Sequence, residues 1–551
     1  MQDNIASLLE AITDAQIDID PQRTALVHGE RSVTWREFDD RAARLAGFLA
    51  SAGVGPGDRV GIALYNSPEY LETLYGALKL RAVPVNVNYR YREAELAQVL
   101  SYAGVAALVA DSSMREAATA VAARLPGLRI RLVVGEAVEA AGEVGDYERA
   151  LAETAPLPRQ PRSPHDQILL LTGGTTGAPK GVVWDCASVI DVVSSAFRRA
   201  GVPVPRDRAE LVAAARDAVG SGTAPVMLPG SPLMHGTGFF STLGNLLRGG
   251  RIVTLPGRTL DPAALWEAVQ RHRVEELAIV GDAFAVPLLA ELDRGAAEGR
   301  PYDLAGLRRV FSSGVRWSVE VKRRLLQAGR MTLQDSIAAT EGGPFGLSLV
   351  GPDPDSVTSR FTVAPNARVI GPDGSDVVPG SGEVGVLACT GPLPLGYLDA
   401  PEQTAAVFRE IDGIRYAVPG DAATVEADGT LTLLGRGAGV INTGGEKVFA
   451  EEVEEALVAH PGVAEAVVVG VPDERWGSRI TALVVAEAGA QPTQRELAEH
   501  VGRRLAGYKR PRSVFFVDTV DRTISGKIDR RRAHDRVRQL AAEQDPTPTA
   551  G

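Results

Sequence analysis

The chain carries the stretch LLLTGGTTGAPKG at Leu169–Gly181. Its first residues predict a buried strand, because a short apolar run that ends at turn residues is typical of a parallel sheet. In the loop that follows, glycines let backbone N–H groups approach an anion closely, threonine hydroxyls add donors, and Lys180 adds positive charge. The stretch therefore predicts a strand that leads into a phosphate-binding loop, and an ordinary Gly/Thr-rich turn is the alternative.

Two better-known nucleotide-binding patterns do not occur in the chain. The P-loop spacing G-x-x-x-x-G-K-[ST] fails at Gly526-Lys527, because Asp521 stands where the first glycine is required. The dinucleotide-binding spacing G-x-G-x-x-G fails after Gly437–Gly439, since Asn442 occupies the place of the last glycine. The sequence therefore disfavours both a P-loop NTPase and a dinucleotide-dependent dehydrogenase.

Composition restricts the partners and the compartment. The 551 residues suffice for roughly three to four domain-sized units. A formal net charge of −11 argues against a surface that binds nucleic acid. The two cysteines, Cys186 and Cys389, fit reduced thiols in a cytoplasmic protein, and the seven scattered histidines do not have zinc-site spacing. No apolar run approaches the ~18 residues of a membrane span, so we expect no integral membrane segment.

Strand and helix patterns alternate along the first part of the chain. Thr24–His28 and Ser32–Thr34 flank Gly29-Glu30 and predict a hairpin, and Thr34-x-x-Glu37 predicts a capping box at the start of a helix. Arg59–Leu64 then predicts a strand and Glu69–Leu80 a helix. This alternation is typical of an α/β fold with parallel sheets.

The last part of the chain predicts a separate small domain. A helix is expected to begin at Ala450 and to end at His460-Pro461-Gly462, and another to begin at the capping box Thr493-x-x-Glu496. The tail from Gln544, with its Pro-Thr repeats, predicts disorder. Three strands are expected in this domain, at Val463–Val469, Ile480–Glu487 and Val514–Val517.

Three further motifs accompany the phosphate-binding loop in a fixed order: YAVPGD at Tyr416–Asp421, Gly435-Arg436, and RTISGKIDR at Arg522–Arg530. In order and spacing the chain resembles the adenylate-forming (ANL) superfamily of acyl-CoA synthetases, luciferase-like enzymes and peptide-synthetase adenylation domains. It looks most similar to bacterial ligases for steroid side-chain and other bulky acids. The resemblance covers nearly the whole chain.

The resemblance implies a division into domains. We expect a large N-terminal domain at residues 1–436, built of layered α/β subdomains with parallel-rich sheets and a small β-barrel-like part. A hinge at 437–440, a mobile α+β lid domain at 441–540 and a disordered tail at 541–551 follow. The hinge position, usually Asp or Lys, is Ala438 here, which makes the pivot softer.

The resemblance also implies a function. The chain is expected to be an ATP-dependent carboxylic acid–CoA ligase that forms an acyl-adenylate and pyrophosphate and then the CoA thioester. ATP, Mg²⁺ and CoA are the expected cofactors, and a small carboxylic acid is the expected substrate. An acyl-AMP ligase that loads a carrier protein and a non-catalytic acyl- or AMP-binding protein are the alternatives. The sequence does not fix the oligomeric state, and a homodimer is the assembly to consider.

Activation brings two anions together, the carboxylate and the α-phosphate. A lysine at about 4 Å contributes on the order of 4 kcal/mol at an effective dielectric near 20. The resemblance places the catalytic lysine at Lys527, although a solvated lysine in a basic tail is the alternative. It assigns further catalytic roles to Glu341 and His235, and magnesium contacts to Thr172 and Glu341. A lone Thr-Glu pair is otherwise typical of a helix N-terminus, and a lone histidine of a packed core.

The remaining site residues come from the same resemblance. Ile337 replaces the usual aromatic residue beside adenine, and Gly174 replaces the usual serine of the phosphate loop. For CoA the implied residues are Gly444, Gly445 and Glu446. For ATP and AMP they are Thr172, Gly173, Gly174, Thr175, Thr176, Gly177, Lys180, Ser313, Gly314, Val315, Asp335, Ser336, Ile337, Thr340, Asp421, Arg436 and Lys527.

The acyl pocket is implied at His235, Phe239, Gly281 and Gly314. Adenylation domains for amino acids carry an aspartate in the His235 motif, whereas Phe239 and Phe240 stand here, which disfavours an amino-acid substrate. The small residue Gly281 suits a wide apolar pocket, although packing between strands would also explain it. Together with the polar insert at Arg198–Gly230, these residues favour a medium- or long-chain acid, or a bulky acid such as a steroid side chain.

Overall fold

The computed structural model describes residues 1–135, 145–173, 179–314, 317–358, 360–371, 373–436, 440–521 and 530–544. The chain divides into two compact units. The first comprises 1–89, 96–172 and 181–434, and the second comprises 90–95, 173–180 and 435–551. The division at 434/435 lies beside the predicted domain boundary, and 437–439 of the predicted hinge lie outside the described residues. In the part of the chain that is described, no helix combines the length and apolar character needed to cross a membrane.

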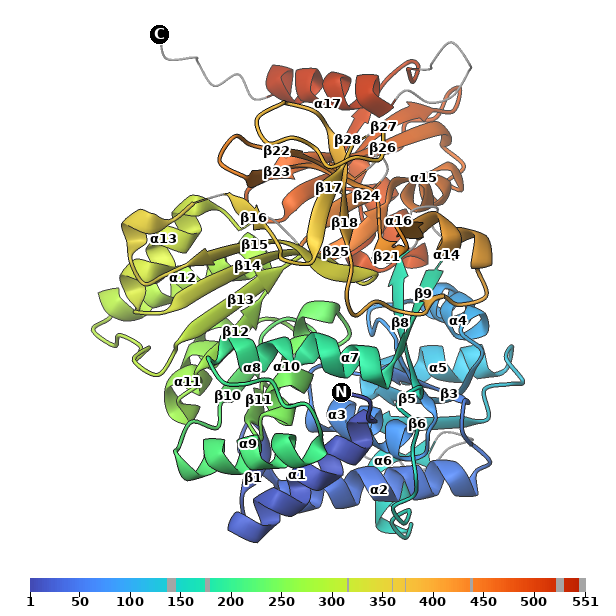
Figure 1. The fold of residues 1–551 in the computed structure, drawn as a ribbon. Helices are drawn as coiled ribbons and strands as arrows, with labels where there is room; N and C mark the ends of the chain where they lie inside the picture. Colours follow the sequence, from blue (N-terminus) through green and yellow to red (C-terminus); the bar gives the residue numbers. More distant parts are fainter. Residues whose placement is uncertain are drawn as a thin grey trace. The chain divides into compact units, whose positions relative to one another are not determined.

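The first unit contains a sheet whose parallel half alternates with helices (Figure 1). The helices α11 (Pro262–His272), α12 (Gly281–Ala297) and α13 (Val319–Ala328) connect successive strands, as the α/β prediction requires. Their apolar residues pack with the strands into one core cluster that includes Trp266 and Trp317. The parallel strands are, in sheet order, β1 (Thr24–His28), β11 (Arg251–Thr254), β10 (Val226–Pro229), β12 (Glu276–Ile279), β13 (Arg309–Ser313) and β14 (Thr332–Ala339).

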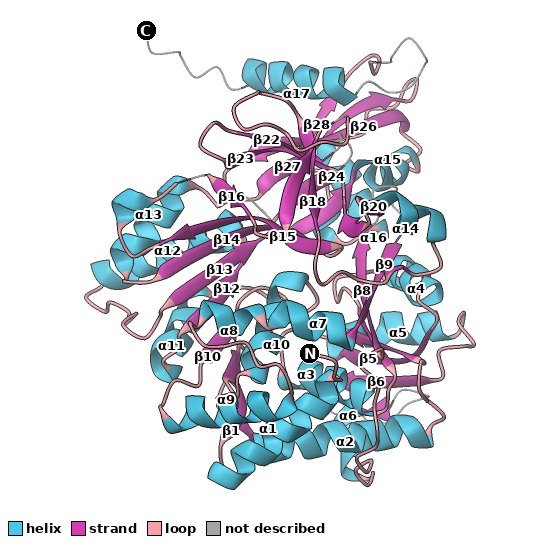
Figure 2. Ribbon diagram, viewed as in Figure 1, coloured by secondary structure: helices cyan, strands magenta, loops and turns pink. Residues whose placement is uncertain are grey.

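An antiparallel part continues this sheet beyond β14 (Figure 2). A small β-barrel-like part is expected in this domain, and among the described residues the strand order of this antiparallel part is an open path. A turn at Asp428-Gly429 joins β22 to β23, and Gly429 has φ +78°. The strands are β15 (Gly342–Val350), β16 (Phe361–Val363), β17 (Ala367–Ile370), β18 (Gly385–Cys389), β20 (Phe408–Ile411), β21 (Ile414–Ala417), β22 (Asp421–Val425) and β23 (Thr430–Arg436).

A second sheet holds the strand that precedes the phosphate-binding loop. Its order is β19 (Gly396–Tyr397), β9 (Pro179–Asp185), β8 (Gln167–Gly173), β4 (Val83–Asn86), β3 (Arg59–Ala63), β5 (Val105–Asp111), β6 (Ile130–Val134) and β7 (Gly145–Asp146). The strands β3, β4 and β8 are parallel. β3 and β4 are almost entirely buried, as are Ile168, Leu169 and Leu170 of β8, which explains the apolar sequences of these segments. The predicted strand at 169–171 is therefore confirmed as part of β8.

The predicted N-terminal hairpin and capping box are confirmed. β1 pairs with β2 (Arg31–Thr34) in antiparallel register, and Thr34 and Glu37 form the reciprocal cap of α2 (Trp35–Ser51). The insert at 198–230 contains a helix, α9 (Arg208–Gly220), which lies beside α1 (Ile5–Ile19). Two ion pairs join these helical regions, Arg208–Asp3 at 2.8 Å and Arg216–Asp18 at 2.6 Å.

From residue 440 on, the described part of the second unit is a mixture of helices and strands, as expected for a small α+β domain. A hairpin of β24 (Val440–Thr443) and β25 (Glu446–Phe449) precedes a three-stranded sheet. The capping box at Thr493 and Glu496 is confirmed. The strand predicted at Val463–Val469 extends to Asp473, because residues 470–472 continue the antiparallel pairing with residues 478–480. The other elements are α15 (Ala450–Val458), β26 (Val463–Asp473), β27 (Gly477–Ala486), α16 (Gln494–Arg504), β28 (Ser513–Phe516) and α17 (Arg530–Gln544).

Both cysteines are free and buried in the first unit. Cys186 is 0% exposed and Cys389 is 1% exposed. Burial raises the pKa of each thiol to about 12, because the thiolate loses its hydration. The prediction of unpaired thiols is therefore confirmed.

Candidate active site

Four parallel strands of the first unit end along one edge of the large sheet, which we call the site edge (Figure 2). After β10 the chain leads to His235, after β12 to Gly281, after β13 to Gly314, and after β14 to Glu341. Parallel strands present their carboxyl ends on the same side of a sheet, where α/β proteins bind ligands. The fold thus brings together four predicted site residues that are far apart in the sequence.

Glu341 lies in the turn between two strands. Ala339 of β14 pairs with Gly342 of β15, so Thr340 and Glu341 form a two-residue hairpin turn rather than a helix N-terminus. The Glu341 side chain is buried at 5% exposure, and Tyr397 Oη donates a hydrogen bond of 2.6 Å to its Oε1. Trp184 Nε1 donates to Thr340 O at 3.2 Å. Tyr397 and Trp184 belong to strands of the second sheet, which therefore fix the turn that carries the carboxylate.

His235 is the N-cap residue of α10 (Gly236–Leu247) and is half-buried. Gly238 permits the tight entry into this helix, because a Cβ there would lie 2.5 Å from Pro232 O. Phe239 is 3% exposed and contacts the Phe240 ring, with 5.3 Å between ring centroids. Phe239 therefore packs in the interior, whereas Phe240 is half-buried beside it.

The predicted adenine-side residues follow β13 and belong to β14. Ser313 Oγ donates to Ser336 O at 2.9 Å and ties the two strand ends together. Gly314 has φ +94°, a value that favours glycine, and nothing lies within 4 Å of the position a Cβ would take. Gly281 N donates to Ser312 Oγ at 2.9 Å, which places the predicted acyl-pocket glycine beside the same strand end.

The carboxylate of Asp335 is held by a lysine inside the protein. Its Oδ2 accepts from Lys322 Nζ at 2.8 Å, and both side chains are almost fully buried. Burial raises the pKa of Asp335, and the positive charge of Lys322 opposes the rise. Asp421, in contrast, is half-buried at the start of β22, directly after Gly420 with φ +95°.

The structure describes some of the remaining predicted site residues and leaves others outside the described part of the chain. Thr172 and Lys180 lie at the end of β8 and the start of β9 and are half-buried, and Ile337 continues β14. Gly173 and Arg436 belong to β8 and β23. Gly174, Thr175, Thr176, Gly177, Val315 and Lys527 lie outside the described residues.

The predicted CoA-binding glycines have a structural explanation of their own. Gly444 (φ +57°) and Gly445 (φ +86°) form the two-residue turn between β24 and β25, and a turn with two positive φ values favours glycine. Gly444 N donates to Trp476 O at 2.9 Å, and a Cβ on Gly444 would lie 2.8 Å from the Trp476 ring. Within the same unit, Glu446 is buried and pairs with Arg90 at 2.9 Å.

Three residues near the site edge were missed by the sequence analysis: Asn66, Asn86 and Tyr397. Asn66 follows shortly after the apolar strand β3, and Asn86 is the last residue of the apolar strand β4. A polar residue at the carboxyl end of a buried parallel strand is the signal that could have identified them. Tyr397 had no comparable signal, since its partner Glu341 is 56 positions away in the sequence.

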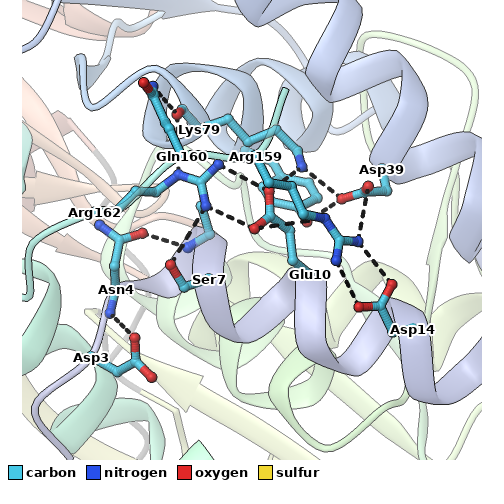
Figure 3. Close-up of polar contacts among 12 residues, drawn as sticks. Asp3, Asn4, Ser7, Glu10, Asp14, Asp39, Lys79, Arg159, Gln160 and Arg162 are labelled. Carbon is cyan, nitrogen blue, oxygen red and sulfur yellow. Dashed lines mark hydrogen bonds and ion pairs between the residues drawn. The ribbon is translucent and has the colours of Figure 1, made fainter. Parts of the chain in front are cut away.

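A hollow of about 550 Å³ elsewhere in the first unit is lined by two acidic residues of α1, Glu10 and Asp14, and by Arg159 and Arg162. Figure 3 shows that these charges are paired with one another. Lys79 Nζ donates to Glu10 at 2.8 Å and to Asp39 at 2.7 Å, and Arg162 donates to Glu10 at 2.8 Å. We call Glu10, Asp39, Lys79 and Arg162 the ion cluster, and we regard it as a structural brace.

Comparison with known proteins agrees with this geometry. Residues 13–398 match the family "AMP-binding enzyme", and residues 452–527 match "AMP-binding enzyme C-terminal domain". The 3-oxocholest-4-en-26-oate–CoA ligase of Rhodococcus rhodochrous is 38% identical, over 98% of this chain and 97% of the relative. A medium/long-chain-fatty-acid–CoA/3-oxocholest-4-en-26-oate–CoA ligase of Mycolicibacterium smegmatis is 37% identical, over 98% of each chain.

The fold is similar to that of a solved structure. The amide bond synthetase McbA of Marinactinospora thermotolerans superimposes with a TM-score of 0.78 at 24% identity, over 96% of this chain and 99% of that chain.

Proposed function

The chain belongs to the AMP-binding enzyme family and is an acid–thiol ligase, and from this premise we propose that its acid is a medium- or long-chain or bulky, steroid side-chain-like carboxylate. The observation that carries the proposal is the similarity to two such ligases over 98% of the chain. The structure adds a site edge that gathers His235, Gly281, Gly314 and Glu341 from four parallel strands.

In the first half-reaction, a carboxylate oxygen attacks the α-phosphorus of ATP. The bond from that phosphorus to the bridging oxygen breaks, and pyrophosphate leaves with the electron pair. Two anions must approach each other, so positive charge is needed between them. We propose that Lys527 supplies this charge and that Asp421 accepts hydrogen bonds from the ribose hydroxyls, a role that suits a carboxylate because it is only an acceptor.

Magnesium fits the residues at the site edge. Mg²⁺ prefers oxygen ligands and is bound through one or two carboxylates together with substrate phosphates. Glu341 offers a carboxylate that Tyr397 orients, and Thr172 offers a hydroxyl at the end of β8. Among the residues that the structure describes, no three His, Cys, Asp or Glu side chains group as a metal site, which agrees with a metal held largely by phosphates. When bound, Mg²⁺ would stabilise the charge that develops on the phosphates.

In the second half-reaction, the deprotonated sulfur of CoA attacks the acyl carbon. The bond from that carbon to the AMP oxygen breaks, and AMP leaves. We propose that the turn at Gly444 and Gly445, with Glu446, guides the thiol arm of CoA. A cytoplasmic location is part of the same proposal and fits two free, buried thiols.

One assay tests the ligase and its substrate together. Pyrophosphate release is measured with ATP and Mg²⁺, with and without CoA, on acids from acetate through fatty and aryl acids to steroid side-chain acids. We expect acyl-CoA to form with the longer or bulkier acids. Activation of acetate alone would contradict the proposed substrate class. Pyrophosphate release without a thioester would indicate a carrier-protein thiol as the acceptor.

A variant separates the two half-reactions. Lys527→Ala is expected to lose adenylation almost completely, while thioester formation from a preformed acyl-adenylate is less affected. Equal loss of both steps would contradict the proposed role of Lys527, and wild-type activity would favour a binding protein without catalysis.

A further inference from the structure

Asn86 closes β4 of the second sheet, and its side chain is buried at 8% exposure. β4 and β8 run parallel and pair at Val85 and Leu169. Two positions beyond this pair, Leu171 of β8 forms hydrogen bonds with the side-chain amide of Asn86 in the way that a backbone group of a neighbouring strand would. Asn86 Oδ1 accepts from Leu171 N at 2.5 Å, and Asn86 Nδ2 lies 3.4 Å from Leu171 O as a donor. The side chain thereby extends the ladder by one position, to the residue before Thr172.

The same amide also contacts the segment that leads from β10 to His235, one of the residues predicted to line the acyl pocket. Asn86 Nδ2 donates a hydrogen bond to Met234 O, the carbonyl directly before His235. Leu171 and Met234 are 63 positions apart in the sequence, and they belong to different sheets or their following loops. One buried amide therefore joins the strand that leads to the phosphate-binding loop and the segment that leads to His235.

Asn66 provides a natural contrast, because its contacts lie on the acyl side. Its Nδ2 donates to Pro229 O at 2.7 Å and to Ser231 O at 2.9 Å, and its Oδ1 accepts from Leu233 N at 2.7 Å. These partners run from Pro229, the last residue of β10, to Leu233, two positions before His235. Asn66 thus fixes the backbone before His235, as Asn86 does, but among the described residues its side-chain hydrogen bonds do not include the β8 strand.

We propose that Asn86 is a positioning residue. It sets the spacing between the end of β8, which leads to the phosphate-binding loop (the phosphate side), and the segment that leads to His235 (the acyl side). Asn66 positions the acyl side alone. This inference rests on the proposed ligase function, which requires the acid and the α-phosphate to meet. A neutral amide suits the task, since it anchors backbone groups without adding charge beside two anionic reactants.

The test compares Asn86→Ala with Asn66→Ala in acid-dependent pyrophosphate release. Loss of a buried hydrogen-bond partner is expected to weaken positioning by about five- to tenfold. For Asn86→Ala we expect KM to rise by this factor for both ATP and the acid. For Asn66→Ala we expect the rise for the acid only. A merely structural role would lower the amount of folded enzyme and leave both KM values unchanged.

A second measurement does not depend on turnover. ATP with Mg²⁺ should raise the Tm of the wild type and of Asn66→Ala by similar amounts, and that of Asn86→Ala by less. If Asn86→Ala does not fold, Asn86→Ser takes its place in both measurements. Unchanged KM values and an unchanged Tm rise in the Asn86 variant, or equal effects of both variants on ATP, would overturn the inference. If the wild type released no pyrophosphate with any acid, that result would instead contradict the ligase function.

Discussion

The ion cluster around Glu10 of α1 and the two asparagines near the site edge, Asn66 and Asn86, are buried polar braces of opposite kind. In the ion cluster, Glu10 is held by Lys79 and Arg162, so charge opposes charge. At the site edge, Asn66 and Asn86 hold backbone groups with neutral amides. Removing one member of a buried ion pair leaves a charge without compensation, whereas removing an amide leaves only unmatched dipoles. The first brace should therefore control stability and the second should control substrate positioning.

The largest effect is expected from breaking the ion cluster. Lys79→Met leaves Glu10 and Asp39 without the cation that bridges them, and should lower the free energy of unfolding by about 3 kcal/mol. Chemical denaturation measures the change, and turnover per folded molecule should stay the same. Arg149→Met is the control, since its pair with Glu153 is exposed and is worth less than about 1 kcal/mol. A similar loss in both variants would remove the distinction between the two braces.

The carboxylate of Glu341, which we propose holds Mg²⁺, should behave in the opposite way. Glu341→Gln keeps the size of the side chain and can still accept from Tyr397, but it loses the negative charge proposed to hold Mg²⁺. We expect pyrophosphate release to fall by about 100-fold, with little change in the free energy of unfolding. Stopped assays across Mg²⁺ concentrations, paired with denaturation curves, test this. A stability loss as large as that of Lys79→Met would place Glu341 among the structural acids.

The hydrogen bond from Tyr397 to Glu341 should have an intermediate effect. Tyr397→Phe removes the donor that orients the carboxylate, so the Mg²⁺ concentration for half-maximal activity should rise by about tenfold. Binding of Mn²⁺–ATP, followed by electron paramagnetic resonance, should weaken in parallel. Tyr302→Phe is the matched control, because Tyr302 also donates to a glutamate, Glu291 of α12, for which no role in the reaction is proposed. Equal behaviour of the two variants would exclude a positioning role for Tyr397.

The Gly444 turn in the second unit offers a smaller test. Gly444→Ala forces a Cβ against Trp476 at a positive φ, a strain of roughly 1 kcal/mol or about fivefold. The CoA-dependent step should slow by this factor while adenylation stays unchanged, and separate assays of the two half-reactions measure it. Gly489→Ala also has a positive φ but has open space around its Cβ position, so it serves as the control for strain alone.

The smallest effect is a dependence of stability on pH. Burial lowers the pKa of His28, whose Nδ1 lies 2.9 Å from Thr254 Oγ1, and Arg31 adds to the shift while Glu69 opposes it. The unfolded chain therefore binds the proton more readily, so the free energy of unfolding should fall as pH drops through about 6.5. Denaturation curves above and below that pH should differ less for His28→Gln than for the wild type. An identical difference would show that His28 does not contribute.

Local signals in the sequence were sufficient for the strand before the phosphate-binding loop, the capping boxes at Thr34 and Thr493, and the small C-terminal sheet. Each depends on residues only a few positions apart, where periodicity and side-chain caps act. The Thr340–Glu341 turn could not be assigned in this way, because Thr-Glu is not a usual pair for a two-residue hairpin turn, which favours Asn-Gly, Asp-Gly or Gly-Gly.

Contacts over long sequence separations account for what the sequence could not predict. The bonds from Tyr397 to Glu341 and from Asn86 to Met234 span 56 and 148 positions, and nothing in either neighbourhood specifies them. The buried pair of Asp335 with Lys322 likewise became visible only when α13 was seen to lie against β14. The family resemblance named residues of the site, and the fold then identified the neutral groups that hold them.

The two buried cysteines give the first unit a built-in reporter of its own opening. Cys186 and Cys389 are the only thiols in the chain, and each is shielded and carries a pKa of about 12. An alkylating reagent should therefore modify them only in molecules that have opened, because reaction requires an accessible thiolate. The labelling rate in native buffer would measure how often each of these two regions opens, residue by residue, without any engineered probe.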